Sequence, residues 1–162
     1  MKMSTSSPVQ FYSVNNYRPH ASVAYLMMRN KSIYQRVADM KLAHLGITSS
    51  QMSVLMMIAH NENATISSVS QLLGSDAAAI VRIVHKLEAQ LLIQRLPSKT
   101  DRRVTHLLLT AEGKRLMKQI PSVLSELLNH SLAGFTVQEF EQFKDFLLRV
   151  EENNLQQLKA TL

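Results

Sequence analysis

Two consecutive segments indicate how this 162-residue chain folds: SDAAAIVRIVHKLEAQ at residues 75–90 and LLIQRLPSKTDRRVTHLLLT at residues 91–110. At about 100° per residue, the first segment has one apolar face and an opposite face that is small and basic. The apolar arc consists of Ile80, Ile83, Val84 and Leu87, and the opposite arc of Ala78, Arg82, His85 and Ala89, with Lys86 at its edge. Ser75 or Asp76 can accept a free backbone N–H at the start of the segment. The pattern therefore predicts a capped amphipathic helix with a buried apolar face and an exposed basic face.

The second segment predicts a β-hairpin with a basic tip. Two β-prone apolar runs, residues 91–96 and 104–109, flank the turn-forming sequence PSKTD at 97–101. The tip carries Lys99, Arg102 and Arg103 around the single acid Asp101. Guanidinium groups suit phosphate oxygens and a narrow minor groove. For a hairpin alone, the alternative to a DNA contact is a charged tip that is simply exposed to solvent. However, a basic helix followed at once by a basic hairpin is typical of a winged helix-turn-helix that binds DNA.

Composition excludes several classes of protein. There is no cysteine, so the chain has no disulfide framework, thiolate zinc site or thiol redox sensor. No apolar run is long enough to span a bilayer, and the N-terminal MKMSTSSPVQ lacks the apolar centre of a signal peptide, so we expect a cytoplasmic protein without a membrane partner. We find no nucleophile elbow, phosphate-binding glycine loop or His-Glu-x-x-His, and the six histidines lack metal spacing. We therefore expect no enzyme, no catalytic residue, no cofactor and no metal site, and we assign the four glycines to helix ends and turns.

Charge is distributed unevenly along the chain. The formal net charge is +6, made up of +4 over residues 1–75, +5 over residues 76–118 and −3 over residues 119–162. The excess is densest around the predicted helix and hairpin, which indicates a polyanionic partner. A membrane surface is the competing polyanion, but this region lacks a wide apolar face for lipid.

The segments before residue 75 predict three further helices. A long helix follows Pro19 and ends near Gly46, which is a C-cap signal. A capping box at residues 48–51 opens a second helix that runs to His60. Residues 66–73 form a short third helix, capped by Ser67 or Ser68, in which Val69, Leu72 and Leu73 are buried. A turn at Gly74-Ser75 then completes a helix-turn-helix arrangement.

The segments after the hairpin predict two helices. Thr110 caps the first, which runs from Ala111 to about Leu132 with a kink at Pro121. Its buried positions are Leu116, Ile120, Val123, Leu124, Leu127 and Leu128. After a break at residues 133–135, a capping box at residues 136–139 opens the last helix. That helix carries an apolar stripe formed by Phe140, Phe143, Leu147, Val150, Leu155 and Leu158.

Apolar helices at both ends of the chain predict a dimer interface, with a monomeric bundle as the alternative. The expected fold is mainly α with a small β-hairpin. Residues 1–45 form an N-terminal arm and first helix for dimerisation, residues 46–110 a winged helix-turn-helix domain, and residues 111–162 the C-terminal dimerisation helices.

In these segments the chain resembles the MarR family of bacterial transcription regulators. The resemblance is carried by LGIT at 45–48 with Gln51, ISSVSQLLG at 66–74, Asp76 with Arg82, LLIQR at 91–95, DRR at 101–103 with LLL at 107–109, and TAEG at 110–113. It extends in detail from Leu45 to Met117. It implies a homodimer that reads a pseudo-palindromic operator in double-stranded DNA, with repression as the usual outcome.

The resemblance also assigns roles to individual residues. Arg82 matches the recognition-helix arginine, Arg103 the wing-tip arginine of an Asp-x-Arg motif, and Asp76 the acid at the start of the recognition helix. We expect Asp76 or Asp101 to orient Arg103, which lowers the ordering cost on binding. The family usually has Ser, Thr or Lys where this chain has Ala77, Ala78 and Ala79, so direct base reading rests on few side chains. The predicted DNA contacts are Ser75, Ala77, Ala78, Arg82, His85, Lys86, Lys99, Arg102 and Arg103.

Members of this family often respond to small aromatic anions held between the dimer and DNA-reading lobes. The corresponding positions here are Tyr17, Arg18, His20, Tyr25, Met28, Arg29, Met52 and Met56. Methionines adapt to flat ligands and an arginine can hold a carboxylate, although core methionines and solvated arginines are the alternative. We expect a homodimeric repressor that an aromatic carboxylate releases from its operator; the alternative is a winged helix that binds proteins without a ligand response.

Overall fold

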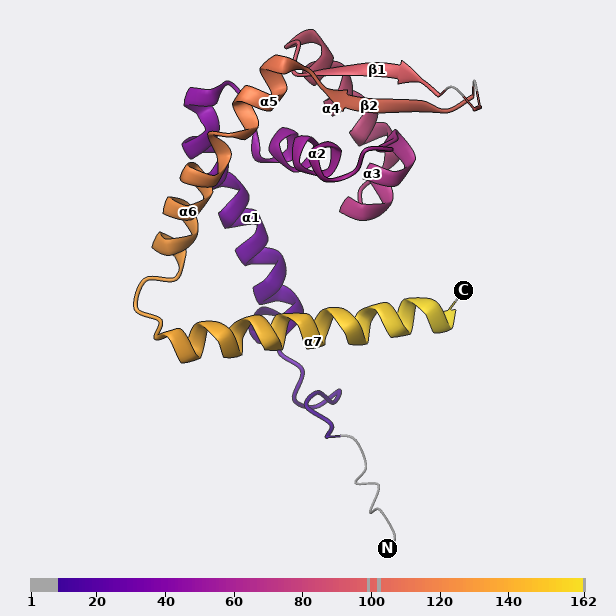
Figure 1. Ribbon diagram of the computed structural model, residues 1–162. Coiled ribbons are helices and arrows are strands. Elements are labelled where there is room, and N and C mark those ends of the chain that lie inside the picture. Colours follow the sequence, from indigo (N-terminus) through magenta and orange to yellow (C-terminus); the bar gives the residue numbers. More distant parts are fainter. Residues whose placement is uncertain (1–8, 99, 102, 162) are drawn as a thin grey trace, which may run out of the picture. The chain divides into compact units, whose positions relative to one another are not determined.

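The computed structural model describes residues 9–98, 100–101 and 103–161, and the chain divides into two compact units, residues 1–50 and 51–162. The expected fold class is confirmed, since helices make up most of the chain and the two strands form one antiparallel hairpin (Figure 1). Among the described helices, none is by itself long and apolar enough to cross a membrane; Val23–Leu45 and Ser49–His60 pass that test only as a pair bent by 76°.

The first unit is organised around α1 (Val23–Leu42). Pro19 opens a 3₁₀ turn, Pro19–Ala21, rather than the α-helix itself, and Ser22 caps α1 by accepting the Tyr25 N–H at 3.2 Å. A second 3₁₀ turn, Ala43–Leu45, ends at Gly46 with φ +71°, as its predicted C-cap role requires. The Tyr12 hydroxyl accepts the Val23 N–H at 3.0 Å, so the segment before the helix folds back onto its start.

The second unit contains the remaining elements, except for the first two residues of α2 (Ser49–His60), which belong to the first unit. These elements are α2, α3 (Ile66–Leu73), α4 (Ala77–Ala89), β1 (Ile93–Pro97), β2 (Thr105–Leu109), α5 (Ala111–Met117), α6 (Ile120–Ser131) and α7 (Val137–Thr161). The fully buried core of the unit contains Val54, Leu55, Val69, Ile80, Val84, Leu87, Leu107 and Ile120. α2, α3, α4 and the hairpin all contribute to it, and this shared core fixes the basic helix beside the strands.

Two details of α3 differ from the prediction. Thr65, not Ser67 or Ser68, is the N-cap: Ser68 N–H donates to Thr65 Oγ1 at 3.1 Å and Thr65 N–H donates to Ser68 Oγ at 2.9 Å. Serine at the third helical position completes a capping box, a role usually filled by Glu or Gln. Leu72 was predicted to be buried, but its side chain is 62% exposed. Of the eight residues in this helix, Val69 is the buried one.

The hairpin pairs Ile93 with Leu109 and Pro97 with Thr105, and Leu107 N–H donates to Ala64 O at 2.7 Å, which ties β2 to the turn between α2 and α3. The predicted start of the first strand at residue 91 is wrong. Leu91 has φ +58° and an exposed side chain, and its N–H donates to Glu88 O. It occupies the left-handed position that often closes a helix, so the strand begins two residues later.

The predicted single helix over residues 111–132 is also wrong. α5 ends at Met117, and α6 starts at Ile120 with Pro121 in its first turn. In a continuous helix, residue 121 would donate its N–H to the carbonyl of residue 117, and proline has no N–H. In the first turn of a helix this N–H is not needed. The chain therefore starts a new helix near Pro121 instead of continuing one helix with a kink. Three of the positions predicted to be inside, Leu116, Ile120 and Leu127, are buried, but Leu128 is exposed.

Both capping residues predicted after the hairpin are confirmed. Thr110 Oγ1 accepts the Gly113 N–H at 3.0 Å at the start of α5. Thr136 and Glu139 form the capping box of α7, with Thr136 N–H donating to Glu139 Oε2 at 2.8 Å and Glu139 N–H donating to Thr136 Oγ1 at 3.2 Å. Hydrogen bonds from the backbone and hydroxyl of Thr136 hold the pKa of Glu139 below its usual value.

The sequence assigned all four glycines to helix ends and turns, but Gly113 also allows two backbone segments to approach each other closely. Its N–H serves the cap, but a Cβ at this position would lie 2.0 Å from Leu92 O. Thr110 draws the two segments together, since its N–H donates to Leu92 O at 3.1 Å and its hydroxyl to Leu91 O at 2.6 Å. α5 thus approaches the turn after α4 so closely that no side chain fits.

Gly113→Ala is expected to lower the free energy of unfolding by about 1–3 kcal/mol, because the backbone of Leu92 must move to admit the methyl group. Urea denaturation followed by circular dichroism measures the change. Glu112→Ala, at the exposed neighbouring position, is the control and should stay within about 0.5 kcal/mol of wild type. Equal stabilities for the two variants would show that the close approach is easily relaxed.

Candidate nucleic-acid interface

The basic face of α4 is built by its cap and its core. Asp76 is the N-cap, with Ala79 N–H donating to Asp76 Oδ2 at 3.1 Å, and Gly74 with φ +56° ends α3 two residues earlier. Ile80, Val84 and Leu87 are buried and Ile83 is half-buried. The helix therefore presents its opposite face to solvent, and the exposed residues there are Ala77, Ala78, Arg82, His85, Lys86 and Ala89.

Ser75, a predicted DNA contact, already forms hydrogen bonds within the protein. Its carbonyl accepts a hydrogen bond from Ser70 Oγ at 2.5 Å, and its hydroxyl donates to Leu73 O at 3.3 Å. These contacts hold the turn between α3 and α4. The long hydroxyl contact is the weaker of the two, so the side chain can exchange it for another acceptor at small cost.

The hairpin tip presents one arginine in a defined pose. Arg103 donates from Nε to Asp101 Oδ1 at 3.2 Å and from Nη2 to Asp101 Oδ2 at 3.1 Å, and its backbone N–H donates to Oδ1 at 3.0 Å. The guanidinium is otherwise open to solvent, with 91% of the side chain exposed. Of the two acids expected to orient Arg103, Asp101 has this geometry, whereas Asp76 caps α4. Lys99 and Arg102 lie outside the described residues.

Pairing with Arg103 holds the pKa of the Asp101 carboxyl below its usual value, through hydrogen bonds from the side chain and the backbone of the arginine. A lowered pKa means that the interaction is fully present above the pKa of a free aspartate and is lost only as the pH falls through the lower, folded-state value. The pose of Arg103 is therefore unaffected by pH changes near neutrality.

An ion pair outside the predicted contact set joins α4 to the hairpin. Arg95 Nε on β1 donates to Glu88 Oε1 at 2.9 Å, and His85 Nδ1 lies 3.8 Å from Glu88 Oε2. Both members of the Glu88–Arg95 pair are partly buried. The i, i+3 spacing of His85 and Glu88 was visible in the sequence, but pairing with Arg95 depends on the angle between helix and strand, which the sequence does not display.

The residues expected to bind an effector are divided between the units. In the first unit His20 and Tyr25 meet edge to face with ring centroids 5.1 Å apart, and Tyr17 packs against Tyr12 at 6.1 Å. Arg18, Met28 and Arg29 are exposed there. In the second unit Met52 is buried and Met56 half-buried. Neither unit by itself brings all eight residues together, and among the described residues no cluster of three His, Asp or Glu could hold a metal ion.

Comparisons with known proteins show which sequences and folds this chain is similar to. The model of the MarR family matches residues 47–105. The transcriptional repressor IacR of Pseudomonas putida is 25% identical over 134 residues, which cover 83% of this chain and 80% of IacR. A mutant of MarR from E. coli, solved in complex with operator DNA, has a TM-score of 0.73 at 23% identity, covering 79% of this chain and 92% of that one. CouR from Rhodococcus jostii, solved with bound p-coumaroyl-CoA, has a TM-score of 0.70 at 22% identity, covering 80% and 92%. The two solved structures share the fold of this chain.

Proposed function

We propose that this chain, whose residues 47–105 match the MarR family, regulates transcription by binding double-stranded DNA. The observation that carries the proposal is the pairing of an exposed basic helix face with an exposed, carboxylate-oriented arginine at the hairpin tip. A helix of this kind enters the major groove, and a hairpin beside it reaches the flanking backbone or minor groove.

The exposed face of α4 and the hairpin tip would recognise DNA in different ways. Ala77 and Ala78 offer only methyl groups, which can contact a thymine methyl but form no hydrogen bond to a base edge. Arg82 is left as the main direct reader, assisted by His85 and Lys86. Arg103, held by Asp101, loses little conformational freedom when it enters a narrow minor groove, so groove shape carries much of the specificity.

We assign the protein a homodimeric state, with residues 46–110 as the DNA-reading domain and residues 1–45 and 111–162 as dimerisation segments. The 25-residue α7 has no buried residue in the single chain. Its exposed large apolar side chains are Val137, Phe143, Phe146, Leu147, Leu148, Leu155 and Leu158. A contiguous apolar face of this size marks a protein interface, and a second copy of the same helix offers a matching surface. Two subunits then read the two halves of a pseudo-palindromic operator from within the cytoplasm.

Repression and ligand release complete the proposal. IacR is named a repressor, and CouR was solved with an aromatic acyl-CoA. By analogy, this chain represses transcription until a small aromatic carboxylate binds between the dimer and DNA-reading segments. Arg18 or Arg29 would hold the carboxylate, and Met28 and Met56 would contact the ring.

Salt dependence distinguishes a DNA-binding protein from a winged helix that binds other proteins. Affinity for a duplex should fall about 1000-fold or more between roughly 50 and 200 mM salt if about six phosphates are contacted, because each contact releases counterions. Fluorescence anisotropy with a labelled duplex measures the slope. Binding to duplex DNA that is undetectable at about 50 mM salt would favour the protein-binding alternative.

Aromatic carboxylates should release the protein from its operator. A panel of benzoates, phenylacetates and cinnamates, added to the preformed complex in a gel-shift experiment, is expected to contain at least one compound that frees the DNA. Methyl esters of the same compounds are the matched controls, since they keep the ring and remove the charge. Retention of the complex across the whole panel would contradict this effector class.

A further inference from the structure

A hollow at the root of the hairpin is lined by none of the predicted effector residues. Its volume is about 390 Å³, within the range of small-molecule sites. It is lined by Ile58, Ala59, Glu62, Gln94, Leu108, Leu109 and Lys114. These residues come from the C-terminal end of α2 and the turn that follows it, the ends of the two strands nearest the helices and the first turn of α5, all within the second unit.

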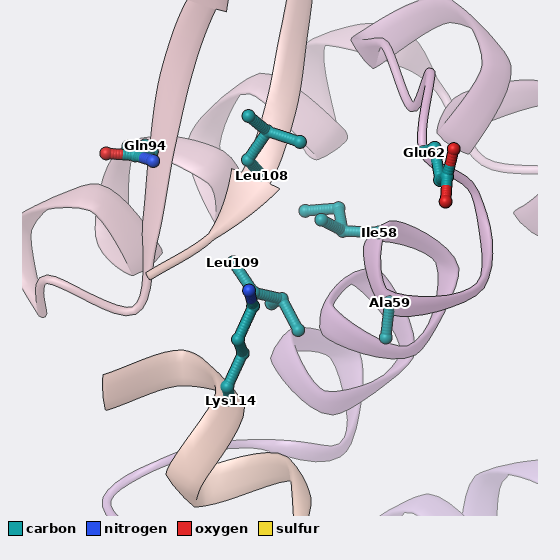
Figure 2. Close-up of a pocket in the computed structure, with 7 residues that line it drawn as sticks. All are labelled: Ile58, Ala59, Glu62, Gln94, Leu108, Leu109 and Lys114. Atoms are coloured by element: carbon teal, nitrogen blue, oxygen red, sulfur yellow. The ribbon is translucent and has the colours of Figure 1, made fainter. Parts of the chain in front are cut away.

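The floor of the hollow is aliphatic. Ile58 is 4% exposed, and Leu108 and Leu109 are half-buried. Figure 2 shows Ile58 and Leu108 directed toward the same central space, whereas the Gln94 side chain is directed away from it. Gln94 pairs with Leu108 across the hairpin, so both belong to the face opposite the buried Ile93 and Leu107; Gln94 is exposed there and Leu108 is half-buried. A flat apolar body fits this floor.

Two opposite charges border the floor at separate points. The Lys114 side chain runs toward the base of the strands with its ammonium beside Leu109, and Glu62 stands on the far side, beyond Ile58 (Figure 2). Both residues are exposed, and neither has an ion pair with another described residue. An ammonium can bind a carboxylate, and a carboxylate can accept a hydrogen bond from an amine.

We propose that this hollow binds a small dipolar molecule with a flat apolar body, a carboxylate at one end and an amino group at the other. The carboxylate pairs with Lys114, the ring lies on Ile58 and Leu108, and the amino group donates to Glu62. The proposal does not depend on the proposed function, because it concerns only the lining of one cavity.

The elements around the hollow are those that hold the hairpin in place. Leu107 N–H on Ala64 O ties β2 to the turn after α2, and Thr110 ties α5 to the turn after α4. A molecule that bridges Glu62 and Lys114 adds a third link between the same elements. Its binding should therefore protect the amides of β2 against hydrogen exchange.

The test is a titration of the full-length protein, without DNA, with 4-aminobenzoate, 4-aminophenylacetate and 3-(4-aminophenyl)propionate. This series lengthens the molecule stepwise, so it does not require the distance between the two charges in advance. We expect saturable shifts of the Ile58 and Leu108 methyl resonances with at least one member. Benzoate and aniline, which each lack one end group, should bind at least about tenfold more weakly.

Matched variants locate the site. Lys114→Met and Glu62→Met remove each charge but keep an unbranched side chain of similar length, and each should weaken binding of the best ligand at least about tenfold. Lys118→Met and Glu112→Met remove the same charges from exposed positions on or beside α5 that do not line the hollow, and they should leave affinity unchanged. Equal losses in the control variants, or no methyl shifts with any member at millimolar concentration, would overturn the proposal. Failure of DNA binding would leave this result untouched, since no step of the titration contains DNA.

Discussion

Arg103→Ala is expected to weaken specific operator binding at least about 30-fold while leaving the dimer folded. Each arginine placed in a groove contributes about 1–3 kcal/mol of specific affinity, and a dimer loses two of them. The loss should be large here because Ala77 and Ala78 make no hydrogen bonds to bases, which leaves few other specific contacts. Gel-shift titration against an operator selected from a random duplex pool measures the change.

Two controls separate the position of Arg103 from its charge. Arg115→Ala removes the same charge from an exposed α5 residue that pairs with Glu112, and it should change operator affinity only slightly. Asp101→Asn makes the tip more positive but frees the guanidinium, so it should raise affinity for random duplex and lower the preference for the operator. Equal effects of Arg103→Ala and Arg115→Ala would contradict the role of the hairpin tip.

Phe143→Glu combined with Leu147→Glu is expected to convert the proposed dimer into monomers. Both side chains lie on the exposed apolar face of α7, and a carboxylate buried there without a partner costs far more than a protein interface tolerates. Deletion of residues 140–162 should have the same result. Light scattering measures the mass, and operator affinity should fall together with it, because a monomer reads only one half-site.

Gln142→Glu combined with Gln156→Glu is the matched control for this change. It adds two negative charges to the polar side of the same helix and should leave the dimer intact. A monomeric wild-type protein, or a dimer that persists in the Phe143/Leu147 variant, would show that α7 is not the interface.

Local physical chemistry was sufficient to predict much of the fold. The two faces of α4 follow from the spacing of its apolar residues. The short polar side chains just before them predicted a cap at Ser75 or Asp76, and Asp76 is the one that caps the helix. Thr110 and the Thr136–Glu139 pair were recognised as caps for the same reason. The hairpin and its basic tip followed from two β-prone runs around a turn sequence. Each of these features depends on residues within a few positions of one another.

Features that depend on distant segments were not predicted. Leu91 closes a helix in a left-handed conformation usually given to glycine, because the strand that follows must turn back onto the core. Gly113 is required by a carbonyl more than twenty residues away in the chain, and Arg95 meets Glu88 only after α4 and β1 have packed. The break before Pro121 was predicted as a kink, since the sequence shows that one hydrogen bond is lost but not how the chain responds.

The cap of α4 also determines how a duplex can approach it. An uncapped helix N-terminus attracts phosphate through its free N–H groups and its dipole. Here the exposed carboxylate of Asp76 already accepts the Ala79 N–H, and its charge repels a phosphate from that end. In the proposed complex, sugar–phosphate strands would thereby be directed toward Arg82 and Lys86, farther along the helix. A single acidic side chain would then limit the angles at which the major groove can receive α4.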